Sequence, residues 1–596
     1  MSGEKASGAE ILRRSLVHAG VRVMFGHPGG AILPFYDALH EAPGPRHILM
    51  RHEQGAAHAA DGYARASGEV GVCVATSGPG AANLVTGLAT ALCDGVPIVA
   101  VTGQVPSTLL GTDAFQECDT LGIMMPVTKH GTLIRRAQDI PDVVAQAFEI
   151  ARSGRPGPVL VDIPKDVQFA EMDVPAHLTA KNLISVRPGD STTPPDAERD
   201  RFATSFVDGK PTTTGAAVAA ALARLRASER PILMVGRGVI SSETADLVRE
   251  LAEATNLPVV TTLLGLDAFP TLHPQCVGMP GMHGTQRSNQ AISASDLIIG
   301  LGVRFDDRVT GKVSKFAPDA GIIHFDIDAR AHGRTIRTDV AVLGNLRQTL
   351  PAFARGASEG YKTPAAWWST IHGWRREAAE PAPPMDARAA KAPPSGRQVS
   401  RAIANVVRRE HAIVVTDVGQ HQMWLAQEVA DADPNTHLTS GGLGTMGYAL
   451  PAALGAAVGA PGRSVWAVIG DGGFQMTLQE LATVVQENLH LRICIMNNGA
   501  LGMVRQWQMR IHGGRRVASD LGAPDFGALA NAYRIHSEMV ETAGELDQAL
   551  DRAATWPGPV VLDLRIPADD EVYPMVPSGA GLSEMWMHAP GETVTS

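Results

Sequence analysis

The sequence of 596 residues lacks several features that would point to particular classes of protein. Its five cysteines are scattered and form no Cys-x-x-Cys pair, which argues against a disulfide framework or a zinc site and favours free thiols in a reducing cytoplasm. No apolar run reaches about 18 residues and the N-terminus has no long apolar core, so we expect neither a membrane-spanning helix nor a secretory signal. Lys/Arg-rich blocks are also missing, which argues against nucleic-acid binding.

The chain also carries little charge. Charged residues make up 19% of it, and the net charge of −10 is spread along the sequence rather than gathered in a tail. Such a balance bears on solubility and says little about partners. Apolar residues make up 44%, which is enough for large buried cores, and at about 150 residues per domain the length allows three or four domains.

Short apolar runs rich in β-branched residues recur along the chain and alternate with helical stretches. Runs of this kind that end in glycine or polar residues are typical of parallel strands covered by helices on both faces. They fall into three groups, which occupy residues 1–175, 213–355 and 396–570. Polar, proline-rich segments at 187–215 and 377–396 are predicted to link the groups. We therefore predict an α/β protein of three doubly wound parallel-sheet domains, followed by a C-terminal tail over 571–596.

An acidic turn and an amide pair stand at the ends of two predicted strands. Asp471 lies in the Gly-Asp-Gly turn after SVWAVIG, and Asn498 ends the run LRICIMNN. Open parallel sheets bind ligands at the carboxyl ends of their strands, so we expect both side chains side by side there. Hard oxygen ligands suit Mg²⁺, which completes its shell with water and phosphate oxygens. A lone Gly-Asp-Gly turn would more often be a simple loop, but the spaced pair predicts a Mg²⁺–diphosphate clamp and resembles the fingerprint of thiamine diphosphate enzymes.

A single glutamate, Glu53, stands in RHEQGAAHAADGYA near the N-terminus. A lone glutamate in such a place is most often a solvated or ion-paired surface group. The small residues around it, among them Gly55 and Gly62, allow tight helix packing and favour a secluded carboxyl group. A secluded carboxyl group tends to stay protonated and can share its proton with a ligand nitrogen. Thiamine chemistry needs such a group beside the pyrimidine ring.

Several longer motifs extend over almost the whole chain: FGHPGGAILPFYDAL, VATSGPGAANLVTGLATALCDGVP, GRPGPVLVDIPKDVQ, GMHGT, LGVRFDDRVTGK, DVGQHQMW, GLGTMGYALPAALGA and LGMVRQWQ. Each is weak alone, but together they are specific. The chain resembles the catalytic subunits of the acetohydroxyacid synthase family, also called acetolactate synthases. The resemblance implies that the three groups are, in order, a pyrimidine-binding domain, a central FAD-binding domain and a diphosphate-binding domain, with the tail near the active site.

The resemblance implies residues for thiamine diphosphate and its metal by position. Mg²⁺ would be bound by Asp471, Asn498 and the carbonyl group of Ala500. Met446 in GLGTMG would support the bent cofactor, although a methionine is by itself more often core packing. The other contacts would come from Gly29, Gly30, Glu53, Gly419, Gln420, His421, Gly444, Gly470, Gly472 and Met503.

For FAD the resemblance implies residues at strand ends and loops of the central group, together with one arginine of the first group. Arg304 has an alternative role as a surface ion-pair partner of Asp306 or Asp307. The flavin would be structural and regulatory, because acetolactate formation needs no net redox change. The implied set is Arg155, Gly236, Gly281, Met282, His283, Gly284, Thr285, Arg304, Asp306, Asp326 and Ile327.

The resemblance also implies a substrate pocket built from Phe115, Gln116, Lys165 and Trp507, with Glu53, Gln116 and Lys165 as the catalytic residues. The charge of Lys165 would attract the carboxylate of a 2-keto acid; alternatively, it pairs with Asp166. A large aromatic such as Trp507 distinguishes an ethyl from a methyl acceptor by about 1–3 kcal/mol.

The implied activity is that of a transferase. It would decarboxylate pyruvate and join the remaining two-carbon unit to a second 2-keto acid, giving 2-acetolactate or 2-aceto-2-hydroxybutyrate for branched-chain amino-acid synthesis. The alternatives are a related FAD-containing thiamine enzyme such as pyruvate oxidase, a carboligase with another acceptor, and a regulatory homologue without turnover. The family forms its active sites between subunits, so the resemblance implies a homodimer or homotetramer, with a small regulatory subunit as a further partner.

Overall fold

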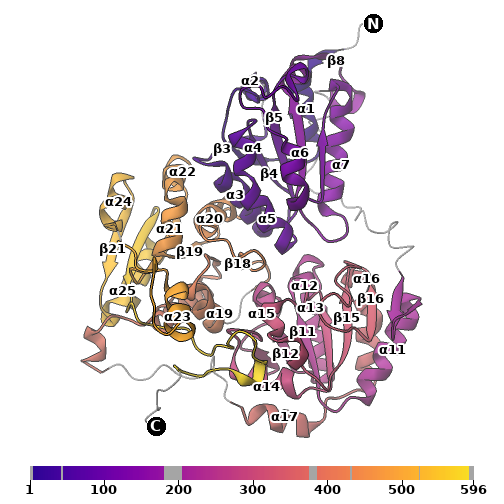
Figure 1. Cartoon of the computed structure of the whole chain (residues 1–596), viewed down its shortest axis with the longest axis vertical. Helices are drawn as coiled ribbons and strands as arrows, with labels where there is room; N and C mark the ends of the chain where they lie inside the picture. The colour runs from indigo at the N-terminus through magenta and orange to yellow at the C-terminus, as the bar shows by residue number, and fades with distance from the viewer. Residues whose placement is uncertain are drawn as a thin grey trace.

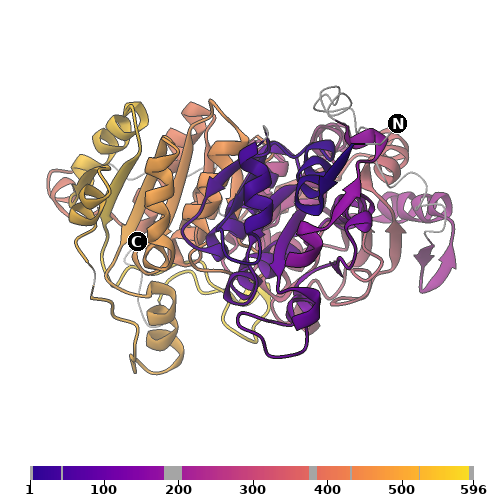
Figure 2. The same cartoon turned by 90° about the horizontal axis from the view of Figure 1, so that it is seen from above.

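The computed structural model describes residues 4–41, 44–179, 204–374, 386–429, 433–522 and 524–589. Three sheets and their helices form three α/β units that follow one another along the chain and meet at the centre of the molecule (Figures 1 and 2). The predicted fold class is confirmed. None of the described helices combines the length and apolarity needed to cross a membrane.

The N-terminal sheet is parallel, and the residues of its central strands are buried throughout, as apolar runs covered on both faces should be. In spatial order its strands are β3 (Arg46–Leu49), β2 (Val23–Gly26), β4 (Gly71–Ala75), β5 (Ile98–Gln104), β7 (Val159–Pro164) and β6 (His130–Leu133). One face is covered by α3 (Glu53–Ser67) and α5 (Val85–Asp94). The other face is covered by α1 (Gly8–His18), α2 (Leu33–Glu41) and α7 (Ile140–Arg152).

The central sheet is mixed rather than wholly parallel. In spatial order its strands are β10 (Lys210–Thr212), β9 (Ser205–Val207), β16 (Val340–Leu343), β15 (Gly321–Asp326), β14 (Leu297–Leu301), β11 (Pro231–Val235), β12 (Val259–Thr261) and β13 (Cys276–Gly278). The hairpin β9–β10 runs antiparallel at one edge and β16 to β13 are parallel. The faces are covered by α11 (Thr214–Ala227), α13 (Ala245–Thr255) and α16 (Leu346–Ser358) on one side and α14 (Gln286–Ala294) and α17 (Ala365–His372) on the other.

The predicted linker over 187–215 is therefore wrong in its second half, because residues 205–212 form this hairpin. Its first half lies outside the described residues, as does the first part of the predicted linker over 377–396, up to residue 385. The Asp208–Gly209 turn, in which both residues have positive φ, is the feature that closes the hairpin.

The C-terminal sheet is parallel. In spatial order its strands are β18 (His437–Thr439), β17 (Ile413–Thr416), β19 (Val465–Gly470), β20 (Leu491–Asn497), β22 (Val560–Arg565) and β21 (His536–Val540). On one face lie α20 (Ala449–Gly459), α21 (Asp471–Thr477), α22 (Leu481–Gln486) and α24 (Phe526–Ala532). On the other lie α18 (Gly396–Glu410), α19 (Gln420–Glu428) and α25 (Ala543–Thr555).

The N- and C-terminal units share one hydrophobic core through the helices α3 and α20, which lie side by side (Figure 1). Glycines make this approach possible. A Cβ atom at Gly62 would lie 2.0 Å from the carbonyl oxygen of Ala452, and one at Gly455 would lie 1.8 Å from that of Ala59. Any larger residue at either glycine would force the helices apart. The helix that begins at Glu53 is therefore held rigidly against the C-terminal unit.

Candidate active site

Asp471 and Asn498 follow the carboxyl ends of two neighbouring parallel strands, β19 and β20, in which Gly470 lies opposite Met496. The Asp471 side chain is buried, and its Oδ2 atom has no hydrogen-bond partner among the described residues. Burial raises the pKa of Asp471 to about 6, although backbone N–H groups such as that of Gly472 act in the opposite direction. A buried carboxylate oxygen without a partner is costly, and a cation would satisfy it.

The oxygens around Asp471 fit Mg²⁺ as part of a coordination shell. The Oδ1 atom of Asn498 accepts a hydrogen bond from the Ala500 N–H group at 3.1 Å, so the chain turns back at this point. The described residues contain no group of three or more His, Cys, Asp or Glu side chains arranged for a metal. The protein therefore offers one carboxylate, one amide and backbone oxygens, and phosphate oxygens or water would complete the shell.

The end of β17 lies beside this corner and opens into α19 at Gly419 and Gln420. The Gln420 amide accepts a hydrogen bond from Asn498 Nδ2 at 3.3 Å and donates one to Gln506 Oε1 at 3.0 Å. The ring of His421 sits between two strand ends, because a Cβ atom at Gly419 or at Gly470 would lie 3.0 Å from its Cε1 atom. Burial lowers the pKa of His421 to about 4, so the ring is neutral, and its Nε2 atom has no partner within the described ranges.

The loop between β18 and α20 carries Gly444 and Met446. The buried carboxylate of Asp417 fixes its far end, accepting hydrogen bonds from the N–H groups of Gly447 at 3.1 Å and Tyr448 at 2.9 Å. The Met446 side chain reaches toward the end of β19, since a Cβ atom at Gly472 would lie 3.6 Å from its Cε atom. A flexible apolar side chain is thus held over the strand ends where Asp471 lies.

A cavity of about 1110 Å³ opens between the C-terminal and central units. This volume is at the upper end of, or above, what one drug-sized ligand needs. From the C-terminal unit, the candidate residues that line it are Gly419, Gly444, Met446, Met503 and Trp507. From the central unit and the end of α7, they are Arg155, Met282, His283, Arg304, Asp306, Asp326 and Ile327. Two sets predicted for different cofactors thus share one cavity.

The candidate flavin residues lie around the carboxyl ends of the central sheet. Arg304 forms an ion pair with Asp306 at 3.4 Å, and Asp306 caps the short helix α15 (Asp307–Thr310). Arg155 donates a hydrogen bond to the carbonyl oxygen of Cys93 at 2.5 Å. Asp326 ends β15 and its Oδ1 atom accepts the N–H group of Asp328.

The remaining flavin candidates Gly236, Gly281, Gly284 and Thr285 do not line the cavity themselves but stand next to or near residues that do, such as Arg237, Pro280 and His283. Thr285 caps α14, and the N–H group of Gly281 donates to Asn289 Oδ1 at 2.8 Å. Burial lowers the pKa of His283 to about 4, which leaves a neutral ring. Close contacts restrict two positions to glycine: a Cβ atom at Gly236 would lie 2.4 Å from the Gly302 carbonyl oxygen, and one at Gly284 would lie 2.5 Å from that of Met279.

Glu53 begins α3 and is 8% exposed. Its Oε2 atom accepts a hydrogen bond from Asn83 Nδ2 at 3.0 Å, and no cation pairs with it among the described residues. Gly29 lies against Thr76, whereas Gly30 faces open space. The seclusion expected of Glu53 is present, but Glu53 does not line the cavity in its own chain.

The other predicted catalytic residues lie near the carboxyl edge of the N-terminal sheet. Gln116 has a positive φ of 59° and packs its backbone over Gly78, while the neighbouring Phe115 is 89% exposed. Lys165 begins α8 (Lys165–Phe169), and within the described part of the chain it forms no ion pair with Asp166. That carboxylate instead accepts hydrogen bonds from Ser107. None of Phe115, Gln116 and Lys165 lines the cavity of the same chain.

Sequence reasoning missed residues that hold these sites in place. Asp417 stands two positions before Gly419 in the DVGQ motif, and Gln506 stands next to Trp507 in VRQWQ, so position alone could have marked both. Gln506 is buried and joins Gln420 to the backbone of Val572. A third residue, Asp94, accepts hydrogen bonds from Arg65, Gly441 and Gly442. It gives no such signal, because these partners are distant in the sequence.

The comparisons with known proteins agree with this arrangement. The family models of the thiamine pyrophosphate enzymes match in three parts: the N-terminal TPP binding domain over residues 6–123, the central domain over 218–353 and the C-terminal TPP binding domain over 417–564. The acetolactate synthase of Mycobacterium bovis is 44% identical, over 98% of this chain and 91% of its own length.

Relatives in other lineages match as fully. The acetolactate synthase isozyme 2 large subunit of Escherichia coli is 43% identical over 97% of this chain and 99% of its own length. A probable acetolactate synthase large subunit of Methanocaldococcus jannaschii is 43% identical over 97% of this chain and 95% of its own length. Identity at this level along nearly complete chains leads to one conclusion: the chain belongs to the acetolactate synthase large-subunit family of thiamine pyrophosphate enzymes.

Proposed function

We propose that this chain is the catalytic subunit of an acetolactate synthase. It takes two molecules of a 2-keto acid, removes CO₂ from pyruvate and transfers the remaining two-carbon unit to the second keto acid. The observation that carries the proposal is the buried Asp471 carboxylate oxygen, unpartnered within the described residues, beside Asn498 at the ends of β19 and β20. This is the position at which a metal would anchor the diphosphate of the family's cofactor.

When bound, thiamine diphosphate supplies the carbon nucleophile and the electron sink that decarboxylation requires. Asp471, Asn498 and the Ala500 carbonyl group would hold Mg²⁺, and the N-terminus of α19 with neutral His421 would bind the diphosphate. Met446 supports the cofactor from the loop above. Gly470 and Gly472 leave room at the strand end.

Glu53 holds and moves a proton at the pyrimidine nitrogen. Its carboxyl group is 8% exposed, accepts a hydrogen bond from Asn83 and has no cationic partner in the described ranges, so little water and no ion pair compete for it. The family that the chain resembles forms its active sites between subunits, so Glu53 would serve the cofactor bound by a second copy. We therefore propose a homodimer or a homotetramer with active sites between subunits.

Substrate recognition combines residues of both copies. Lys165, free of an ion pair with Asp166, attracts the keto-acid carboxylate, and Gln116 and Phe115 lie on the exposed loop that reaches the partner. Trp507 and Met503 line the cavity from α23 (Gly502–Ile511), and Trp507 limits the size of the acceptor. A pocket of this kind excludes water, so the two-carbon unit meets a keto acid rather than a proton.

FAD occupies the part of the cavity lined by the central unit, and its role is structural and regulatory. Arg155 and Arg304 supply positive charge there, which suits a dinucleotide diphosphate. The relatives named as large subunits support a small regulatory subunit as a further partner. No observation on this chain favours an oxidase.

The test is incubation of purified protein with pyruvate, thiamine diphosphate, Mg²⁺ and FAD under air. We expect acetolactate without hydrogen peroxide. Peroxide without acetolactate would indicate a pyruvate oxidase and overturn the proposal. A second incubation with pyruvate and 2-ketobutyrate in competition then measures acceptor preference, and glyoxylate in the same assay tests for another carboligase.

A further inference from the structure

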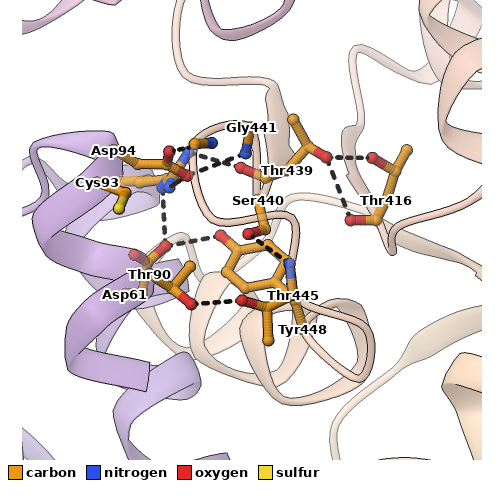
Figure 3. Close-up of polar contacts among 12 residues, drawn as sticks. Asp61, Thr90, Cys93, Asp94, Thr416, Thr439, Ser440, Gly441, Thr445 and Tyr448 are labelled. Carbon is orange, nitrogen blue, oxygen red and sulfur yellow. Dashed lines mark hydrogen bonds and ion pairs between the residues drawn. The ribbon is translucent and has the colours of Figure 1, made fainter. Parts of the chain in front are cut away.

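A network of buried polar residues joins helices of the N-terminal unit to the loop that carries Gly444 and Met446 (Figure 3). Its centre is Arg65 near the end of α3, which is 2% exposed. Arg65 donates hydrogen bonds to Asp61 Oδ1 at 2.8 Å, to Asp94 Oδ2 at 2.9 Å and to the carbonyl oxygen of Thr439 at 3.1 Å. Burial alone would lower the pKa of Arg65, but Asp61, Tyr448 and Asp94 raise it, so the guanidinium stays charged.

The Asp94 carboxylate fixes the start of the loop by accepting hydrogen bonds from backbone N–H groups of the loop. Its Oδ1 atom accepts the N–H group of Gly442 at 2.7 Å, and its Oδ2 atom accepts that of Gly441 at 3.1 Å. With Arg65, this buried carboxylate has three donors from two units of the protein. A buried carboxylate with three donors holds them firmly. The loss of any donor would leave part of the buried charge without a partner, which costs free energy.

The middle and the end of the same loop are fixed from the same two helices. The hydroxyl groups of Thr90, on α5, and Thr445 form a hydrogen bond of 2.8 Å. The Tyr448 hydroxyl donates to Asp61 Oδ1 at 2.6 Å. Figure 3 shows these contacts on the side of the loop that faces α3 and α5. The loop around Met446 is thus positioned by the N-terminal unit of its own chain.

Asp94 also faces the part of the cavity that the flavin candidates line. Asp94, Gly442, Arg155 and Arg304 all line it. A Cβ atom at Gly442 would lie 2.7 Å from Asp94 Oδ1 and 3.1 Å from Arg304 Nη2, so the carboxylate and this arginine both lie against the same side of Gly442. Arg155 reaches the residue before Asp94, through the Cys93 carbonyl oxygen. One carboxylate therefore touches the thiamine loop and adjoins both arginines assigned to the flavin.

We infer that Asp94 is a positioning residue that couples the flavin site to the thiamine diphosphate site. A ligand that orders Arg304 and Arg155 fixes the surroundings of Asp94 and Gly442, and thereby the loop that carries Gly444 and Met446. This inference rests on the proposed function, since it takes the two cofactors as assigned there. Under this inference the flavin, which exchanges no electrons, would order the loop that carries Gly444 and Met446.

The test is a pair of binding titrations on the apoprotein. The dissociation constant of thiamine diphosphate with Mg²⁺ is measured with and without FAD, and that of FAD with and without thiamine diphosphate. Coupling is reciprocal, so both ratios must agree, and we expect about 5-fold or more tightening in each direction. Calorimetry or fluorescence quenching reads binding without turnover.

Two variants should remove the coupling. Gly442→Ala places a methyl group against Asp94 Oδ1, Cys93 Cβ and Arg304 Nη2, at 2.7, 2.8 and 3.1 Å. The φ of this residue is not positive, so alanine can adopt it, but the loop must shift away from Asp94. Asp94→Asn removes the charge and gives one donor where the carboxylate accepts. In both variants, the ratio of the dissociation constants measured without and with the other cofactor should fall below about 2-fold, while each cofactor still binds.

Thr90→Val is the matched control, because it releases the middle of the loop without touching the arginine side. Thiamine diphosphate should bind a few-fold more weakly, and the coupling ratio should stay at the wild-type value. A ratio that persists in both Gly442→Ala and Asp94→Asn overturns the inference, as does a wild-type chain that binds both cofactors independently. A wild-type chain that binds no FAD overturns the flavin assignment of the proposed function as well.

Discussion

The N-terminal and C-terminal sheets have the same strand order, and yet their chemistry differs. In each sheet, the second strand in sequence lies at one edge, next to the first. The fifth strand lies at the other edge, next to the sixth. After β19 stands Asp471, whereas Thr76 stands in the equivalent place after β4. Inside β22 the buried Asp563 pairs with Arg565, whereas the partners of the equivalent Asp162 in β7, as far as the structure describes the chain, are the neutral Thr102 and Gln104. A shared topology thus supplies positions, and the residues at strand ends decide which sheet binds the metal.

The strongest test of this division of labour mixes two variants at a Mg²⁺ concentration that activates the wild-type chain but not Asp471→Asn. Glu53→Gln removes the proton-holding group of one sheet and should lower acetolactate formation by about 10²–10⁴-fold while the cofactors still bind. Asp471→Asn removes the metal ligand of the other. If the sites lie between copies, random mixing after dissociation leaves one intact site in each mixed dimer, and about a quarter of wild-type activity returns.

The mixing experiment separates two arrangements. A site built within one chain would carry one of the two substitutions in every copy, so the mixture would stay inactive. The unmixed variants, taken through the same dissociation and reassociation, provide the baseline. Activity is measured as acetolactate formed per mole of protein.

The second test compares how the buried carboxylates of Asp162 and Asp563 make the free energy of unfolding depend on pH. Burial raises the pKa of Asp162 from 3.8 to about 7, although hydrogen bonds from Thr102 and Gln104 lower it. Between these values the folded chain holds a proton that the unfolded chain has lost. The free energy of unfolding therefore decreases as pH rises from about 4 to 7, by about 4 kcal/mol in total from this residue.

Asp162→Asn should remove that slope. The free energy of unfolding of the variant should therefore rise relative to that of the wild type as pH rises toward 7, and the difference should be constant above pH 7. Urea unfolding at pH 5, 6, 7 and 8 measures the effect. Asp563→Asn is the control: burial raises the pKa of Asp563 too, but Asn497 and Arg565 oppose it. Asp563→Asn should therefore change the slope less than Asp162→Asn does, and equal changes of slope in the two variants would contradict the role given to Arg565.

A third test asks whether the metal belongs to one sheet alone. Asp471→Asn replaces a charged ligand by a neutral one and should cost about 1.5–3 kcal/mol of metal binding, or about 10–100-fold in the Mg²⁺ concentration for half-activation. Thr76→Val alters the equivalent position in the N-terminal sheet, where the hydroxyl group accepts the N–H group of Ala31. That variant should keep the wild-type Mg²⁺ requirement. A shifted requirement in Thr76→Val would mean that both strand ends contribute to the site.

Sequence alone predicts the long buried strands of all three sheets because each is a continuous apolar run. It misses short strands with few buried residues, such as β21, in which most positions are partly exposed. It also takes the hairpin β9–β10 for a linker, because its proline and threonine residues resemble a flexible segment. The Asp208–Gly209 pair was the available signal for a tight turn.

The candidate site divides in the same way. Asp471 and Asn498 are predictable because each follows a recognisable strand, and neighbouring strand ends converge. Asp94 and Gly441 are separated by 347 residues, and no local pattern announces that contact. The separation of Glu53 from the cavity of its own chain is likewise a property of domain packing, which periodicity does not report.

The smallest expected effect concerns Trp507, which lines the cavity from the C-terminal unit. Trp507→Leu enlarges the pocket and should reduce the discrimination between 2-ketobutyrate and pyruvate as acceptors by about 1 kcal/mol, or about 5-fold, because the difference is one methylene group. Competition between the two acceptors measures the product ratio directly. Met503→Leu, in the same helix and nearly equal in volume, serves as the control and should keep the wild-type ratio. An unchanged ratio in Trp507→Leu would move acceptor selection to the N-terminal loop of the partner copy, where Phe115 is exposed.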